Sequence, residues 1–226
     1  MHALFFGSIG SVVETSEMQR DAFNRTFREA GLDWHWDRAT YRAMLAPTGG
    51  ADRIASYAAS RGQSVDAAAL HARKREIFTG LMCADGLTAR PGVLESLAFA
   101  RQSGWKTALV STTARASLDT VLDVTEGLSA SAFDLVTSDA DGYAQKPSPA
   151  AYIAALTRLG SAPERTIAVE DNQAGIEAAH AAALNVVAYL GANTATHPIS
   201  LAGWSSQATV LPVIMGLSAA ALEPAQ

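Results

Sequence analysis

Short apolar runs, each ending at a small or polar residue, constrain the fold of this chain more than any other feature. They are Ala3–Phe6, Thr107–Val110, Phe133–Val136, Thr166–Val169 and Val186–Leu190. The segments between the later runs have helical patterns: Ala114–Val124, Pro149–Leu159 and Gln173–Ala183. Buried strands that alternate with helices are typical of βαβ units. The sequence therefore predicts an α/β fold with a Rossmann-like parallel sheet.

A long helical stretch separates the first apolar run from the others. Ser16–Ala30, Asp52–Arg61 and Val65–Met82 carry apolar side chains at helical spacing, and Asp37 is placed to cap a further helix. No strand pattern interrupts residues 16–82. We therefore expect an all-helical domain at residues 15–88, inserted into an α/β core made of residues 1–14 and 89–226.

Two details of the core are less regular. Pro91 is suited to the first turn of a helix, which we expect to run to Gly104. Gln207–Met215 resembles an edge strand, but Pro212 inside it weakens that prediction.

Composition narrows the class of protein. The 226 residues are 49% hydrophobic and carry a net charge of -5, which leaves no basic surface for nucleic acid. The single cysteine, Cys83, excludes an intramolecular disulfide. No apolar run approaches the roughly 20 residues of a membrane span, and the first strand begins too early for a signal peptide. We expect a cytoplasmic protein with no membrane partner.

Polar residues follow several of the predicted strands. Gly7 to Ser11 follow the first, Ser111 and Thr112 the second, and Glu170-Asp171 the fourth. In open parallel sheets, ligands bind beyond the carboxyl ends of the strands. We therefore expect these residues to share one crevice, with Gly7–Ser11 at its mouth.

The segment from Phe6 to Ser11 resembles the opening motif of the haloacid dehalogenase (HAD) superfamily, Phe-Asp-x-Asp-Gly-Thr/Val. Aligned on Phe6 and Gly10, this chain has Gly7 at the position of the nucleophilic aspartate and Ile9 at that of the acid/base aspartate. Both carboxylates are missing from an otherwise intact frame.

The resemblance extends to the other motifs of the superfamily. It implies that Ser111 holds a phosphoryl oxygen, that Thr112 contacts substrate beside it, and that Lys146 steadies the nucleophile and the phosphate. It also implies that Glu170-Asp171 binds Mg²⁺ together with the backbone carbonyl of Ile9, since Mg²⁺ prefers oxygen ligands. Gly10 and Ser11 then belong to the substrate-binding loop.

The helical insertion resembles the cap of the β-phosphoglucomutase-like and phosphoglycolate-phosphatase-like branch. Its motifs, Thr48-Gly49-Gly50-x-x-Arg53-Ile54 among them, are similar to those of Calvin-cycle xylulose bisphosphate phosphatases. The resemblance implies that Arg53 grips a second phosphate, since guanidinium binds phosphate bidentately. It also implies that Gly49 and Gly50 let the backbone approach a sugar. Gln19 stands where this branch usually has a histidine at the cap entrance.

Each of these residues also has a simpler interpretation. Ser111 is placed to cap the next helix, and Lys146 is also consistent with a solvated loop lysine. Glu170-Asp171 is consistent with acids at a helix N-terminus, where the dipole favours them. Arg53 is equally consistent with a surface arginine of a helix. Only the combination of motifs favours a phosphate site.

The missing aspartates change the expected chemistry. Losing one general acid or base typically costs about 10²–10⁴-fold in rate, and glycine offers no nucleophile. We therefore expect an inactive homologue of Mg²⁺-dependent phosphatases, with Mg²⁺ weakly bound or absent, that retains a phosphate or sugar phosphate between core and cap. One alternative is a weak or altered hydrolase that uses metal-bound water or Glu14. Another is a structural or regulatory partner protein with a vestigial crevice.

Overall fold

The computed structural model describes residues 1–45 and 49–191, which divide into two compact units. Among the described residues, the larger unit contains Met1–Glu14 and residues 87–191, and the smaller unit contains residues 15–45 and 49–86. Thr48 and the candidate strand Gln207–Met215 lie outside the described residues.

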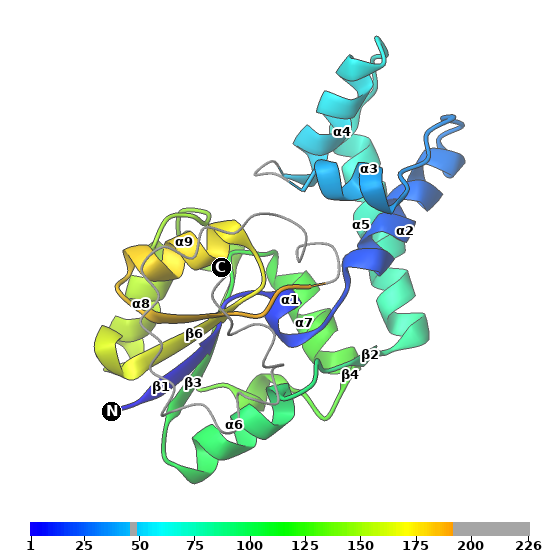
Figure 1. The fold of residues 1–226 in the computed structure, drawn as a ribbon. Helices are drawn as coiled ribbons and strands as arrows, with labels where there is room; N and C mark the ends of the chain where they lie inside the picture. The colour runs from blue at the N-terminus through cyan, green and yellow to red at the C-terminus, as the bar shows by residue number, and fades with distance from the viewer. Residues whose placement is uncertain (46–48, 192–226) are drawn as a thin grey trace. The chain divides into compact units, whose positions relative to one another are not determined.

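The larger unit is built on a parallel sheet with the strand order β5-β3-β1-β6-β7 (Figure 1). The strands are β1 (Ala3–Phe6), β3 (Lys106–Val110), β5 (Leu135–Thr137), β6 (Thr166–Glu170) and β7 (Asn185–Ala188). β1 lies at the centre, with Phe6 opposite Leu109 on one side and Val169 on the other. This confirms the predicted α/β fold with a parallel sheet.

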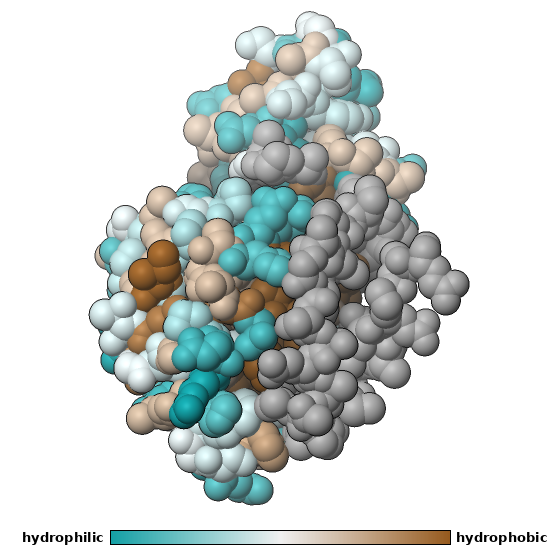
Figure 2. Space-filling model, turned by 60° about the vertical axis from the view of Figure 1, so that its left-hand side comes forward, coloured by the Kyte–Doolittle hydropathy of each residue, from teal (hydrophilic) through white to brown (hydrophobic). Residues whose placement is uncertain are grey.

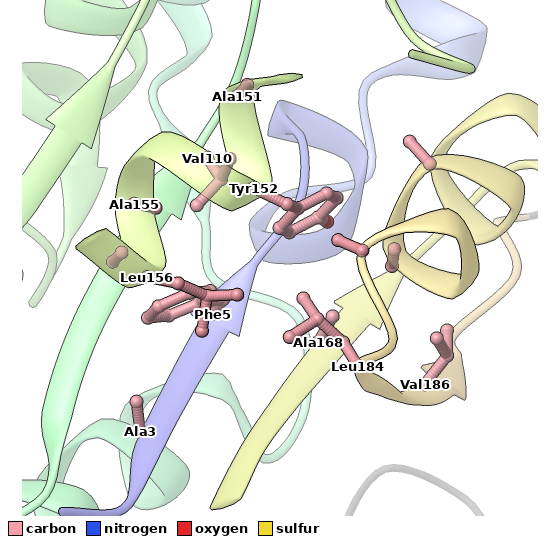
Figure 3. Close-up of a cluster of buried hydrophobic side chains, with 14 of the residues drawn as sticks. Ala3, Phe5, Val110, Ala151, Tyr152, Ala155, Leu156, Ala168, Leu184 and Val186 are labelled. Carbon is pink, nitrogen blue, oxygen red and sulfur yellow. The ribbon is translucent and has the colours of Figure 1, made fainter. Parts of the chain in front are cut away.

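Helices cover both faces of this sheet. They are α6 (Val93–Gln102), α7 (Arg115–Val124), α8 (Ala150–Leu159) and α9 (Gln173–Ala181). Figure 3 shows the core on the face of α8 and α9, where Ala3 and Phe5 of β1 meet Ala155 and Leu156. Because successive residues of a strand point to opposite faces, Phe6 packs on the other face, edge-on to Phe133.

Shorter elements complete the larger unit. A four-residue helix, α1 (Ile9–Val12), follows β1, and β2 (Leu87–Thr88) pairs in parallel with β4 (Thr125–Glu126). Single 3₁₀ turns lie at η1 (Ala130–Ala132), η2 (Asp139–Asp141) and η3 (Pro163–Arg165).

Some boundaries differ from those expected. The helix after Pro91 begins only at Val93, because Gly92 adopts the left-handed conformation with φ 82°. The strand expected at Phe133 begins at Leu135, since Phe133 is the C-cap of the turn η1. The last strand stops at Ala188 rather than Leu190.

The smaller unit is helical in its described residues. It contains α2 (Ser16–Glu29), α3 (Arg38–Ala43), α4 (Gly50–Ser60) and α5 (Ala67–Asp85). As expected, Asp37 caps α3 by accepting from the Thr40 backbone N–H. Its core is an aromatic cluster of Phe23, Phe27, Trp34, Trp36, Tyr41 and Tyr57.

Neither unit has a helix suited to a bilayer among its described residues: none is both long and apolar enough to cross a membrane. The face drawn in Figure 2 mixes hydrophilic residues with scattered apolar ones. Such a mixture is normal at a globular protein's surface.

Candidate functional site

The first loop, Gly7–Ser11, follows the central strand β1 at the carboxyl edge of the sheet. The Gly7 N–H donates to the Val169 carbonyl of β6 at 2.9 Å, which extends the pairing of β1 and β6 by one residue. Ser8 then caps α1 by accepting from the Ser11 N–H. Ser11 is buried, and its hydroxyl donates to the Ser8 carbonyl at 2.7 Å. The Ser11 hydroxyl therefore donates its proton to a backbone group of the same loop.

Lys146 lies among the ends of three strands. Its ammonium donates to the carbonyl of Gly7, to the Val110 carbonyl at 2.9 Å and to Glu170 Oε1 at 2.6 Å. An ammonium has three donors, and these three acceptors satisfy them. The lysine side chain is 10% exposed and the glutamate 0%. Lys146 is therefore no solvated loop residue.

Tyr152 is a member of this group that the sequence did not single out. Its hydroxyl donates to Glu170 Oε1 at 2.7 Å, and its ring lies 4.7 Å from the Lys146 ammonium. Figure 3 shows the ring projecting from α8 toward the carboxyl end of β1. In the sequence it is one apolar position of Pro149–Leu159, so helical periodicity gives no signal of its role.

Burial dominates the electrostatics of this cluster. It raises the pKa of the Glu170 carboxyl; the Lys146 ammonium opposes this shift and Asp171 adds to it. Burial and the nearby Glu170 also raise the pKa of Tyr152 well above its usual range. Glu170 Oε2 is buried without a hydrogen-bond partner. Such an orphaned oxygen is costly when charged.

Gly7 leaves no room for a side chain. A β-carbon at this position would overlap the Glu170 carboxyl and the Tyr152 hydroxyl. These two groups therefore fill the volume that a residue-7 side chain would need. Two residues further along, Ile9 is partly exposed and carries no group able to move a proton.

Asp171 is held differently from Glu170. Its Oδ1 accepts from the Ser8 hydroxyl at 2.6 Å and from Asn172 Nδ2 at 2.7 Å. Its Oδ2 lies against Gly10, where a β-carbon would overlap it. Asn172 also caps α9 by accepting from the Gly175 N–H. Asp171 therefore binds the Ser8 hydroxyl at the partly exposed part of the loop Gly7–Ser11, whereas Glu170 is fully buried beside Gly7.

This arrangement does not fit Mg²⁺. Among residues 1–45 and 49–191, no group of three or more His, Cys, Asp and Glu side chains is placed to hold a metal ion. Glu170 Oε1 is already shared by a cation and a phenol. Because Mg²⁺ demands near-ideal octahedral oxygen geometry, two carboxylates engaged in this way do not fit it.

The loop after β3 is tied to the loop that carries Lys146. Thr112 donates to the Gln145 side chain at 2.7 Å, and Gln145 donates back to the Thr112 carbonyl at 3.2 Å. Ser111 is buried, and its Oγ accepts from the Thr113 N–H at 3.0 Å in a local turn. The N-cap of α7 is Ala114, so Ser111 does not cap that helix.

Arg90 binds the first loop through backbone carbonyls. Its guanidinium donates to the carbonyls of Gly10, Tyr189 and Leu190 at 2.6–2.7 Å and lies 3.4 Å from the centre of the Tyr189 ring. It thereby joins the loop after β1 to the segment after β7. A lone arginine before a proline gives no sequence signal of such a contact.

The candidate cap residues lie in the smaller unit. Arg53 is half-buried; its Nε donates to the Met44 carbonyl at 2.8 Å, and its guanidinium lies over the rings of Phe23 and Tyr41. Arg53 thus lies on a helix, as one sequence interpretation held, but its guanidinium packs against aromatic rings. Gly49 and Gly50 open α4.

Lys74 is a buried cation of this unit that the sequence did not indicate. Its ammonium donates to Gln19 Oε1 and lies 4.8 and 4.7 Å from the rings of Phe23 and Phe78. Burial, with Arg53 and Arg75 nearby, lowers the pKa of Lys74 to about 7. Gln19 therefore serves as an acceptor for a lysine rather than as an unpaired side chain.

Comparison with known proteins shows the family of this chain. A profile of haloacid dehalogenase-like hydrolases matches residues 4–183. The chain belongs to the haloacid dehalogenase-like hydrolase family. This confirms the resemblance seen in its sequence motifs.

Relatives within this family include CbbY proteins and a phosphatase of phosphorylated carbohydrates. CbbY of Rhodobacter capsulatus is 36% identical over 208 residues, which covers 90% of this chain and 92% of CbbY. A phosphorylated carbohydrates phosphatase of Thermotoga maritima is 28% identical and covers 81% of this chain and 82% of its own.

Crystal structures of CbbY from Rhodobacter sphaeroides are similar throughout. One is a complex with phosphate, and another is a variant in complex with xylulose-(1,5)bisphosphate. Both have a TM-score of 0.78 and 34% identity, and cover 90% of this chain and 93% of theirs. The fold described above is therefore the fold of the HAD-like hydrolase family, and CbbY shares it.

Proposed function

We propose that this protein binds phosphate or a sugar phosphate at the carboxyl end of its core sheet without hydrolysing it through an aspartyl phosphate. One observation carries the proposal: at Gly7, where the family resemblance places the nucleophile, Glu170 and Tyr152 occupy the side-chain volume. Covalent catalysis needs a nucleophile at the reacting phosphorus. Ile9 offers no general acid either.

The case for binding rests on charge. Lys146 brings a positive charge to the strand ends, where it attracts an anion by its charge although its three donors are engaged by the protein. The partly exposed Thr112 lies on the adjacent loop. A site without the two aspartates repels a phosphate dianion less, because like charges disfavour one another at short range. Relatives that bind phosphate and xylulose-(1,5)bisphosphate support this ligand class. Within the smaller unit, Arg53 remains the candidate for a second phosphate.

Inorganic phosphate provides the first test. It should raise the melting temperature of the wild-type protein, since a ligand stabilises the state it binds by RT ln(1 + [L]/Kd). Lys146→Ala should abolish this rise. Because Lys146 also holds strand ends together, the phosphate-induced shift is compared for each variant, not the absolute melting temperature. Lys106→Ala is the matched control, since Lys106 forms an exposed pair with Asp134.

Turnover provides the second test. With Mg²⁺ present, p-nitrophenyl phosphate and sugar bisphosphates should be hydrolysed no faster than without protein. Saturable turnover that disappears in Lys146→Ala would replace this proposal with the altered hydrolase. An equal phosphate shift in wild type and Lys146→Ala would place binding elsewhere and favour the partner protein with a vestigial crevice.

A further inference from the structure

Ser8 lies in the first loop with its hydroxyl aimed at a carboxylate. Its Oγ donates to Asp171 Oδ1 at 2.6 Å, although the two residues are 163 positions apart in the chain. Both residues are partly exposed, unlike the buried Glu170. A hydroxyl hydrogen-bonded to a carboxylate is the arrangement in which a base activates an oxygen nucleophile.

The surroundings fix this pair. Ser8 has an extended backbone, with φ -163° and ψ 170°, at the junction between β1 and α1. Asp171 is oriented by Asn172 Nδ2, and glycine at position 10 leaves space for its second oxygen. Lys146 contacts the carbonyl of Gly7, the residue before Ser8. The nucleophile, its base and a cation thus gather at one end of the sheet.

We propose that Ser8 accepts a phosphoryl group from an acyl phosphate, with Asp171 as the base. The Ser8 oxygen forms a bond to phosphorus, the bond from phosphorus to the acyl oxygen breaks, and the Ser8 proton passes to Asp171 and then to water. The products are phosphoserine and a free carboxylate. This inference rests on the proposed function in one respect: the phosphoryl group must bind near Lys146.

The lack of a proton donor at Ile9 determines which class of phosphoryl donor suits the site. An alkoxide leaving group needs a proton, which isoleucine cannot supply. A carboxylate leaves without one, so an acyl phosphate suits a site that has lost its general acid. The product should persist, because phosphate monoesters are among the slowest compounds to hydrolyse uncatalysed. The phosphoryl group would add a charge of about -1.5 to -2 beside Asp171.

The experiment uses the full chain and acetyl phosphate, with intact mass measured over time. We expect the mass of one phosphoryl group to appear and peptide mapping to place it on Ser8. Ser8→Asn should remain unlabelled; asparagine retains the capping preference of this position but lacks the hydroxyl. Asp171→Asn should slow labelling by about 10²–10⁴-fold. Ser129→Ala, at an exposed serine, should label like wild type.

Hydroxylamine separates the chemical outcomes. It cleaves acyl phosphates and leaves phosphoserine intact, so the label should survive it. A hydroxylamine-sensitive label would indicate a carboxylate acceptor and overturn the proposal. So would labelling of Ser8→Asn at the wild-type rate, an equal rate in Asp171→Asn, lysine acetylation alone, or no label. Hydrolysis of p-nitrophenyl phosphate would instead contradict the proposed function, so the two failures are distinguishable.

Discussion

A side chain at Gly7 and the carboxyl group of Glu170 compete for the same volume: a β-carbon on Gly7 would overlap Glu170 Oε1. Position 7 follows the central strand, and Glu170 ends the neighbouring strand β6. The lack of a side chain at Gly7 therefore accompanies a Glu170 carboxyl that occupies the same space. The absent group leaves no empty cavity, because Glu170 and Tyr152 fill its place.

Gly7→Ala should therefore destabilise the protein. Overpacking of a filled site typically costs about 1–3 kcal/mol, and the obstacles here are a paired carboxylate and a buried phenol. Urea unfolding would measure the loss. Gly80→Ala is the matched control: Gly80 lies within α5 with nothing near its β-carbon position, so alanine should stabilise by about 0.5–1 kcal/mol. Equal effects of the two changes would contradict the packing at Gly7.

Mg²⁺ should bind at millimolar concentrations or more weakly. Glu170 is committed to Lys146 and Tyr152, and Asp171 to Ser8 and Asn172, so a cation must break hydrogen bonds to reach either carboxylate. Titration calorimetry measures the affinity. Micromolar binding that is lost in Asp171→Asn would mean that both carboxylates reorient around the ion.

Lys74 should make stability depend on pH. The pKa of its ammonium falls from 10.5 in the unfolded chain to about 7 in the folded one. Between these values the unfolded chain holds a proton that the folded chain has released, so raising the pH favours folding. Wild type should gain unfolding free energy relative to Lys74→Met from about pH 7 to about pH 9. Denaturation at several pH values tests this, and parallel curves would contradict the buried amine.

Asn24 should be important for the smaller unit. Its side chain accepts from the Trp36 N–H at 2.7 Å and donates to the Trp36 carbonyl at 2.9 Å. Arg20 also reaches that carbonyl, so Asn24→Ala orphans mainly the N–H. An unsatisfied buried donor costs about 1–3 kcal/mol, measurable by urea unfolding. Asn185→Ala, which loses only bonds of 3.3 and 3.4 Å, should cost clearly less.

Periodicity was sufficient to predict the parallel sheet and its helices, because buried parallel strands are continuous apolar runs. The boundaries depended on contacts between distant residues. β5 begins at Leu135 because its ladder with β3 begins opposite Ala108. The strand order, with β1 at the centre, requires pairing partners that no local pattern identifies.

The sequence motifs indicated candidate residues of the site, but they did not indicate the hydrogen-bond partners of these residues. Sequence comparison pointed to Lys146, Glu170 and Asp171, but gave the two carboxylates one shared role. In the structure the two carboxylates have different partners: Glu170 accepts from Tyr152 and Lys146, and Asp171 accepts from Ser8. Tyr152 and Lys74 were missed because each lies within an ordinary helical pattern. Ser8 was missed because the motif specifies the residues on either side of it, Gly7 and Ile9, and leaves position 8 undefined.

Lys146 also has a reason to persist that is independent of any ligand. Its ammonium draws together the ends of β1, β3 and β6, so its removal would loosen three strands at once. A lineage that abandons phosphate chemistry would still be selected to keep this lysine for folding alone. Consider HAD-like sequences that lack both aspartates. Retention of the lysine together with its glutamate would indicate a structural role, whereas retention of Ser8 together with Asp171 would indicate a role in phosphoryl transfer.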